Sequence, residues 1–184
     1  MSNDTECDIQ KDIKLYLAVL RHKDNPGTHE KCYRAIKKDD STLSELKNKI
    51  MVNKDNAGVW RIYETINSRD TIKAQNILMH KLLDNPVIYS YRIDSLWRTC
   101  LLQRECRIEN NYMLDIDYEI QSDDLENIYC IIGKDNIIKH VITPSGGSHI
   151  VVRKMSKEIY DYCQSHNIEI KKDGYVFIEH FVVK

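Results

Sequence analysis

The stretch Tyr112-Met113-Leu114-Asp115-Ile116-Asp117-Tyr118-Glu119 alternates between two kinds of side chain. Because side chains in a strand repeat every two residues, the alternation predicts a half-buried β-strand over 111–120. One face is apolar, and the other carries Asp115 and Asp117, which would stand roughly 7 Å apart along the strand. Carboxylates so spaced suit a pair of hard divalent cations, which lie about 3.5–4 Å apart in two-metal sites. The stretch therefore predicts a sheet that carries a metal site.

A glycine-rich turn further along the chain delivers a histidine onto a second strand. Its sequence is Thr143-Pro144-Ser145-Gly146-Gly147-Ser148-His149-Ile150-Val151-Val152-Arg153. Glycine has no side chain, so the backbone N–H groups of Gly146 and Gly147 can approach an anion closely. Arg153 falls on the same strand face as His149 by the two-residue period. The segment therefore predicts an anion contact beside a strand over 148–153.

The rest of the chain predicts an α+β protein in two blocks, 1–108 and 109–184, packed intimately into one globular domain. In the first block we expect strands over 14–23, 32–37 and 59–66 and helices over 40–53, 67–83 and 90–104. In the second we expect strands over 111–120, 136–142, 148–153, 168–172 and 175–183 and helices over 122–132 and 155–166. Thr42 and Glu45 have the spacing of a capping box. Asp173-Gly174 predicts a tight type I′ hairpin between the last two strands.

The composition is that of a soluble globular protein. The chain has 184 residues, 42% hydrophobic and 30% charged, with a net charge of −1. This balance excludes a generally basic coat for nucleic acid, so any such contact must come from a local patch. No apolar run approaches the ~20 residues that cross a bilayer, and the polar, acidic N-terminus is unlike a signal peptide. We therefore expect a cytoplasmic protein without a membrane partner.

Six cysteines are scattered through the chain without CxxC spacing. Some lie in apolar stretches, such as Cys130 within Ile128-Tyr129-Cys130-Ile131-Ile132. We expect buried, reduced thiols. A zinc site is not predicted, because Cys163 and His166 lack a second pair of ligands.

Hydrophobic-Asp-hydrophobic-Asp on a strand, followed by Thr-Pro-Ser-Gly-Gly-x-His, resembles the archaeo-eukaryotic primase superfamily. The resemblance is to the small primase–polymerase branch of phages, plasmids and viruses, and it is confined to the block 109–184. It implies an N-terminal α/β unit packed on an RRM-like mixed sheet that carries the catalytic carboxylates.

The resemblance also implies roles for individual residues. Asp115 and Asp117 would bind Mg²⁺ or Mn²⁺, and His149 would contact the phosphates of a nucleoside triphosphate. The other residues implied in nucleotide binding are Ser145, Gly146, Gly147, Ser148 and Arg153. Gly147 departs from the family pattern, which usually has a small polar residue two positions before the histidine.

Two residues compete for the role of third acidic ligand. Members of the superfamily carry a late hydrophobic-acidic step, often shortly before Gly-Tyr, which favours Glu169 in Ile168-Glu169-Ile170. Glu179 is the alternative. A hairpin at Asp173-Gly174 would place Glu179 on the apolar face and Glu169 on the open face, so we prefer Glu169.

A polar group marks the junction between the predicted strand 59–66 and the next helix. Arg61 lies within the strand, and Asn67, Arg69 and Lys73 lie around the start of the helix, which is a natural anion site. In primase-like enzymes this unit contacts template or nucleotide, so these four residues are candidates for nucleic-acid binding. The alternative is that Asn67 or Ser68 caps the helix and Arg69 is solvent-exposed.

These features together predict a metal-dependent nucleotidyltransferase that makes or extends primers on a DNA or RNA template. The resemblance implies nucleoside triphosphates, a template and a replication helicase or other replication protein as partners. Two alternatives remain open, a metal-dependent nuclease and a non-catalytic, primase-derived module that binds nucleic acid.

Overall fold

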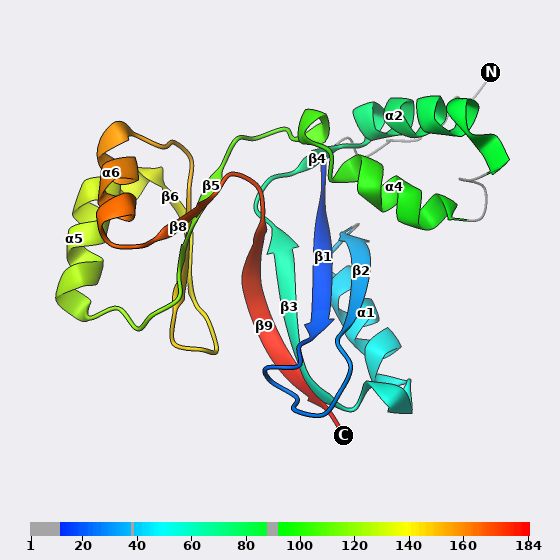
Figure 1. The fold of residues 1–184 in the computed structure, drawn as a ribbon, viewed down its shortest axis with the longest axis horizontal. Helices are drawn as coiled ribbons and strands as arrows, with labels where there is room; N and C mark the ends of the chain where they lie inside the picture. The colour runs from blue at the N-terminus through cyan, green and yellow to red at the C-terminus, as the bar shows by residue number, and fades with distance from the viewer. Residues whose placement is uncertain (1–11, 38, 88–91) are drawn as a thin grey trace, which may run out of the picture. The chain divides into compact units, whose positions relative to one another are not determined.

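The computed structural model describes residues 12–37, 39–87 and 92–184 (Figure 1). Contacts between Cα atoms divide the chain into two compact units. One contains the chain up to Ile13 and residues 68–108, and the other contains residues 14–67 and 109–184. The units therefore do not follow the sequence order that we expected, because the strands over 14–67 group with the C-terminal block. Packing of the chain into one globular domain stays a prediction.

The larger unit contains two antiparallel sheets. The first has the main strand order β2-β1-β3-β9, from β1 (Asp12–Leu20), β2 (Lys31–Lys37), β3 (Gly58–Thr65) and β9 (Tyr175–Val183). Helix α1 (Thr42–Met51), followed by the short η1 (Lys54–Asn56), packs on one face of this sheet (Figure 1). Alternate residues of β1, such as Tyr16 and Ala18, are buried in that core, so Leu17 and Val19 lie on the other face.

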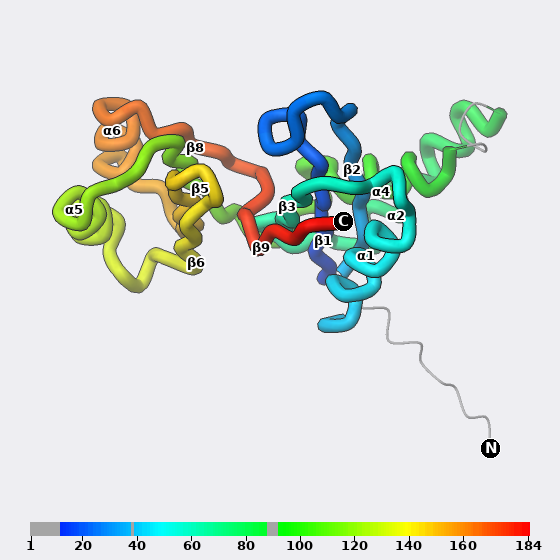
Figure 2. The backbone as a smooth tube through the Cα atoms, turned by 90° about the horizontal axis from the view of Figure 1, so that it is seen from below, coloured from blue at the N-terminus to red at the C-terminus, as the bar shows by residue number. Residues whose placement is uncertain are grey.

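The second sheet is formed by the block that begins at β5. Its elements are β5 (Tyr112–Ile116), α5 (Ser122–Ile132), η3 (Lys134–Asn136), β6 (Ile137–Ile142), β7 (Ser148–Val152), α6 (Lys157–Ser165) and β8 (Glu169–Lys171). The strand order is β6-β7-β5-β8, and every pair is antiparallel. Helices α5 and α6 lie on the same side of this sheet (Figure 2) and pack on Leu114, Ile116 and Ile150. The opposite face carries Asp115 and His149.

The two sheets meet through a small apolar cluster within the larger unit. Ile66 and Val176 belong to the first sheet and its flanks, and Met113 and Val151 belong to β5 and β7. The backbone N–H of Phe177 in β9 also donates a hydrogen bond to His149 in β7, at 3.0 Å. These contacts bring the open faces of the two sheets together.

Two expectations about the sheets are wrong. The second sheet is antiparallel in all described pairs, where a mixed sheet was expected. Strands β8 and β9 form no hairpin, because β8 pairs with β5 and β9 pairs with β3. Gly174 lacks the positive φ that a type I′ turn requires, and its carbonyl instead accepts a hydrogen bond from the N–H of Ile66 at 3.0 Å.

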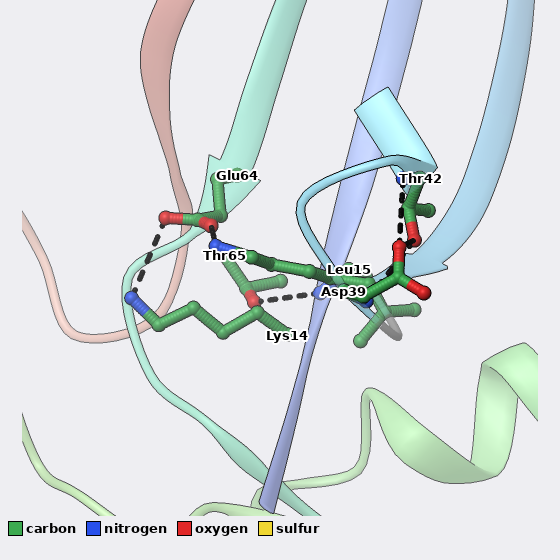
Figure 3. A network of polar contacts seen from close by, with 7 residues as sticks. Lys14, Leu15, Asp39, Thr42, Glu64 and Thr65 are labelled. Atoms are coloured by element: carbon green, nitrogen blue, oxygen red, sulfur yellow. Dashed lines mark hydrogen bonds and ion pairs between the residues drawn. The ribbon is translucent and has the colours of Figure 1, made fainter. Parts of the chain in front are cut away.

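Helix α1 starts without the predicted capping box. Ser41 is the N-cap, and the carboxylate of Asp39 accepts a hydrogen bond from the backbone N–H of Ser41 at 2.9 Å. It also accepts one from the backbone N–H of Thr42 at 3.2 Å (Figure 3). The hydroxyl and the N–H of Ser41, together with Thr42, hold the pKa of the Asp39 carboxyl below its ordinary value. An upstream carboxylate therefore stabilises the helix start, and the carboxylate of Glu45 only accepts a hydrogen bond from the hydroxyl of Ser41, at 3.1 Å.

The start of β1 is fixed to the end of β3 by polar contacts. The N–H of Leu15 donates to the hydroxyl of Thr65 at 3.1 Å, and the ammonium of Lys14 lies 3.4 Å from the carboxylate of Glu64 (Figure 3). The carboxylate of Glu64 also pairs with Lys37, at 3.2 Å. These contacts hold the register of the strand that lines the site.

The smaller unit is mainly helical. It contains the short strand β4 (Arg69–Asp70), which pairs with the start of β1, and α2 (Thr71–Asp84), α4 (Ile93–Leu101) and η2 (Arg104–Cys106). Asp70 caps α2 by accepting a hydrogen bond from the N–H of Lys73 at 3.0 Å, so the expected cap at Asn67 or Ser68 is wrong. Among the described residues, no helix combines the length and apolar character needed to span a membrane.

The cysteines only partly match the expectation of buried thiols. Cys100, Cys106 and Cys163 are buried, and Cys32 and Cys130 are exposed. Cys130 is exposed because α5 turns Ile128 and Ile132 toward the core and leaves the intervening position outside. Cys7 lies outside the described residues.

Candidate active site between the two sheets

The strand register places three predicted site residues in one row. Asp115 on β5 pairs directly with His149 on β7 and, on its other side, with Glu169 on β8. Residues that are directly opposite in neighbouring strands point to the same face, so all three side chains lie on the face away from α5 and α6. Strands β7 and β8 therefore each contribute one residue to this row, because both pair with β5.

The imidazole of His149 is held from both sides. Its Nδ1 accepts the hydrogen bond from Phe177, and its Nε2 lies 3.3 Å from Oδ1 of Asp115. Because Nδ1 accepts, the ring proton of the neutral imidazole is on Nε2 and is donated to Asp115. The Tyr63 ring lies beside the imidazole, with 6.5 Å between centroids and 30° between planes. His149 is thus a fixed hydrogen-bond donor that points into the site.

The carboxylate of Asp115 is also bound by a lysine that sequence reasoning missed. The ammonium of Lys171 contacts Oδ2 of Asp115 and lies 3.2 Å from the carboxylate of Glu169. The hydrogen bond from His149 and then that from Lys171 outweigh burial and lower the pKa of Asp115 to about 2. Contact with Asp115 likewise outweighs burial of the ammonium and raises the pKa of Lys171. Asp115 is therefore a firmly ionised carboxylate.

Asp117 is placed differently from the expectation. Strand β5 ends at Ile116, so Asp117 lies just beyond the strand and is exposed. It lines the same pocket as Asp115, and it makes no hydrogen bond or ion pair with another residue of the described part of the chain. Asp117 is a free carboxylate at the mouth of the site.

A pocket of about 500 Å³ surrounds the row and has walls of opposite charge. Asp115, Asp117 and Glu169 line one wall, and Arg21 and Arg61 line the other. These arginines lie on the face of the first sheet that α1 does not cover, in line with Leu17 and Val19. Such a pocket can bind a ligand that carries both cationic and anionic groups.

The two arginines differ in their surroundings. Arg61 is buried and pairs with Asp24 at 2.5 Å. Burial works against the charge, but the hydrogen bond and the charge of Asp24 outweigh it and raise the pKa of Arg61. Arg21 is half-buried and makes no ion pair with the residues that the structure describes. Arg21 is thus the more available anion ligand, and Arg21 and Tyr63 were both missed because neither belongs to a motif.

The glycine turn has a packing role that we did not expect. A Cβ built on Gly147 would lie 2.1 Å from the carbonyl oxygen of Ile116, so glycine is required for the turn to pass the end of β5. The N–H of Gly146 donates to the carbonyl of Thr143 at 3.0 Å and is not available to an anion. Ser145 lines the pocket. Gly147 therefore shapes the site by close packing.

Two further nucleotide-binding candidates lie away from the pocket. Ser148 is on the helix-covered face of β7, where its hydroxyl lies 3.1 Å from Nε2 of His140. Arg153 follows the end of β7, is exposed, and is absent from the described residues that line the pocket. Arg153 does not reach the pocket although it shares a strand face with His149, because it lies beyond the far end of this short strand.

Of the two competing acidic residues, only Glu169 lies in the site. Glu179 is on β9 in the other sheet, opposite Ile62, and its carboxylate is 2.6 Å from the ammonium of Lys47 on α1. The preference for Glu169 agrees with this placement, but the hairpin register from which we argued it does not exist.

The candidates for nucleic-acid binding separate into different environments. Arg61 lines the pocket, whereas Asn67 is fully buried and exchanges hydrogen bonds with the backbone of Asn111, at 2.8 and 3.3 Å. Arg69 is also buried, contrary to either expectation. Lys73 is exposed beside Asp70, at 3.7 Å. Burial leaves Asn67 and Arg69 no surface for a polymer, so the structure does not support that role for them.

The donor types of the site suit a hard divalent cation. Asp115, Asp117 and Glu169 offer carboxylate oxygens, the ligands that Mg²⁺ and Mn²⁺ prefer. The ammonium of Lys171 already stands in as a cation between Asp115 and Glu169. As the side chains stand, no three His, Cys, Asp or Glu residues in the described ranges are grouped closely enough to hold a metal ion. The donor types therefore suit a divalent cation, and the ammonium of Lys171 lies between two of them.

Comparisons of the chain with family models, with curated proteins and with solved structures give no match.

Proposed function

We propose that this protein is a primase-like, metal-dependent nucleotidyltransferase that acts on a nucleic-acid template. The observation that carries the proposal is the position of Asp115, directly opposite both His149 and Glu169. The βαββαβ order of the second sheet and its strand order β6-β7-β5-β8 support the expectation of an RRM-like sheet. The resemblance in sequence implies that the acidic strand and the histidine lie on neighbouring strands of such a sheet.

The charge distribution of the pocket supports a nucleoside triphosphate as substrate. A triphosphate is a polyanion that binds arginine and a divalent cation together. Arg21 and Arg61 lie on the wall opposite the carboxylates, so the pocket can accept phosphates between the two. An uncharged or purely cationic ligand would leave the guanidinium of Arg21 without a counter-charge.

The residues of the pocket would have different roles in the reaction. Asp115, Asp117 and Glu169 would hold Mg²⁺ or Mn²⁺, which when bound supplies activation of the primer 3′-hydroxyl and neutralisation of the triphosphate. His149 would redirect its Nε2 proton from Asp115 to a phosphate oxygen of the bound substrate, and the N–H of Phe177 keeps the ring in that tautomer. Arg21 and Arg61 orient the anionic tail so that pyrophosphate leaves away from the carboxylates.

The uncovered face of the first sheet is the proposed contact with a template strand. Arg34 on β2 pairs with Leu17 and shares this face with Arg21 and Arg61. Half-buried Leu17 and Tyr63 lie between the arginines. Cations interleaved with apolar and aromatic side chains are the surface to which single-stranded nucleic acid binds. The template would thus reach the pocket along the strands that line it.

Metal-dependent incorporation of labelled nucleotide on a primed template tests the proposal. Wild type should incorporate nucleotide with Mn²⁺ or Mg²⁺, and Asp115→Ala should abolish incorporation. Asp135→Ala, which removes an exposed carboxylate from η3, is the matched control and should retain activity. Degradation of labelled DNA or RNA without added nucleotide, lost in Asp115→Ala, would identify a nuclease instead. Template binding that is indifferent to Mg²⁺ and to His149→Ala, without incorporation, would identify a binding module.

A further inference from the structure

The ammonium of Lys171 lies between the carboxylates of Asp115 and Glu169, two of the residues that would hold a metal ion. It contacts Oδ2 of Asp115 and lies 3.2 Å from Oε2 of Glu169. Both oxygens of Asp115 are therefore engaged, Oδ1 by the His149 imidazole and Oδ2 by this ammonium. A cation that binds Asp115 and Glu169 together must replace Lys171.

The register of β5 and β8 makes this contact a property of the sheet. Lys171 pairs with Met113 and Glu169 pairs with Asp115, so Lys171 and Asp115 are diagonal neighbours on one face. A long side chain spans the roughly 7–8 Å typical of a diagonal pair. Glu169 and Lys171 are two residues apart on the same strand and share that face. The short strand β8 thus presents one acidic ligand and one competing cation to Asp115.

Burial explains why Asp115 needs a counter-charge before any metal binds. The Asp115 side chain is only 11% exposed, whereas those of Lys171 and Glu169 are 33% and 63% exposed. An ionised carboxylate is costly to bury without a partner. Lys171 is the more mobile partner, because its ammonium is on a flexible four-carbon stem with an exposed end.

We infer that Lys171 is a built-in counter-cation, which holds Asp115 and Glu169 in the metal-free protein and is displaced when a divalent cation binds. The inference rests on the proposed metal site. Displacement leaves the ammonium beside the same pocket, where it can bind an anionic phosphate instead. Lys171 therefore lowers the affinity of the site for a metal ion. An anionic substrate raises this affinity, because its phosphate binds the released ammonium.

Binding of Mn²⁺ alone, measured by electron paramagnetic resonance or calorimetry without nucleotide, tests the inference. Lys171→Met removes the competing charge and should bind Mn²⁺ at least tenfold more tightly than wild type. Lys171→Arg keeps the charge and should bind as wild type does. Lys172→Met, the adjacent and exposed lysine, is the matched control and should leave the affinity unchanged. Circular dichroism of each variant establishes that the fold is retained.

A second measurement tests the role of the released ammonium. With saturating Mn²⁺, Lys171→Met should bind a nucleoside triphosphate several-fold more weakly than wild type, although it binds the metal more tightly. A merely structural lysine would not move the two affinities in opposite directions.

The outcomes separate the inference from the proposed function. Weaker or unchanged Mn²⁺ binding in Lys171→Met, with no binding in Asp115→Asn, would overturn the role of Lys171 and leave the metal site standing. Absence of Mn²⁺ binding in both wild type and Lys171→Met would overturn both.

Discussion

The carboxylate of Asp115 and the imidazole of His149 face each other across the β5–β7 pair, with 3.3 Å between Oδ1 and Nε2. Nδ1 of the same ring accepts the N–H of Phe177, so Nε2 is the donor. The pair links the two sheets of the larger unit, because Phe177 belongs to β9 and Asp115 to β5. It also gives Asp115 a stabilising partner in the folded state that the unfolded chain lacks.

Stability should therefore fall in acid as Asp115 is protonated. The folded-state pKa is lowered to about 2, below the ordinary value near 3.9. The stabilisation is present above pH ~4 and is lost as the pH falls toward ~2. In urea unfolding, wild type should lose up to about 2 kcal/mol more than Asp115→Asn between pH ~5 and pH ~2.5. Asp135→Asn, at an exposed position, should keep the wild-type slope, and equal slopes for all three proteins would contradict the prediction.

The late acidic residue offers a sharp comparison between two glutamates. Glu169→Gln removes a carboxylate opposite Asp115 and should lower nucleotide incorporation by about 10²-fold or more, because a charged ligand is removed. Glu179→Gln only breaks the pair with Lys47, which is partly exposed, and should cost at most about 1 kcal/mol with activity retained. Steady-state incorporation and urea unfolding measure the two effects. Equal loss of activity in both variants would remove Glu169 from the site.

Gly147 should tolerate no side chain. In Gly147→Ala the new Cβ meets the carbonyl oxygen of Ile116 at 2.1 Å, and a backbone atom cannot move aside cheaply. We expect a loss of about 2–4 kcal/mol in the free energy of unfolding. Gly174→Ala is the control, because Gly174 has no positive φ and its Cβ position meets only side-chain atoms, the nearest at 3.7 Å. It should lose less than about 1 kcal/mol. Comparable losses of stability in the two variants would show that the turn can move to accommodate a Cβ at position 147.

The alternation around Asp115 was sufficient to predict strand β5, because a period of two residues is a local signal of a half-buried strand. Helix α5 has the predicted bounds 122–132, and β9 has the predicted bounds 175–183. Period two fixes which residues share a face, so the side on which Asp115 lies could be inferred before its neighbours were known. The same rule failed at Asp117 and Arg153, because both strands are shorter than their apolar patterns.

Local sequence patterns could not predict the pairing between strands that are distant in sequence. Asp173-Gly174 has a strong local preference for a hairpin, yet β8 and β9 join different sheets. Their partners, Met113 on β5 and Tyr63 on β3, are far away in sequence. Lys171 was missed for the same reason. A lysine near the end of a strand is unremarkable until the register places it diagonally across from Asp115.

The uncovered arginine face should dominate binding of single-stranded nucleic acid. Arg21 and Arg34 share this face, and removal of one arginine–phosphate pair should reduce the slope of log K against log salt by about 0.7. Arg21→Ala and Arg34→Ala should each weaken binding similarly for any base sequence, because phosphates carry no sequence information. Lys54→Ala removes an exposed charge from η1, which follows α1, and should leave both affinity and slope unchanged. Fluorescence anisotropy of a labelled oligonucleotide at several salt concentrations measures both quantities. A larger loss of affinity in Lys54→Ala than in Arg34→Ala would contradict the prediction.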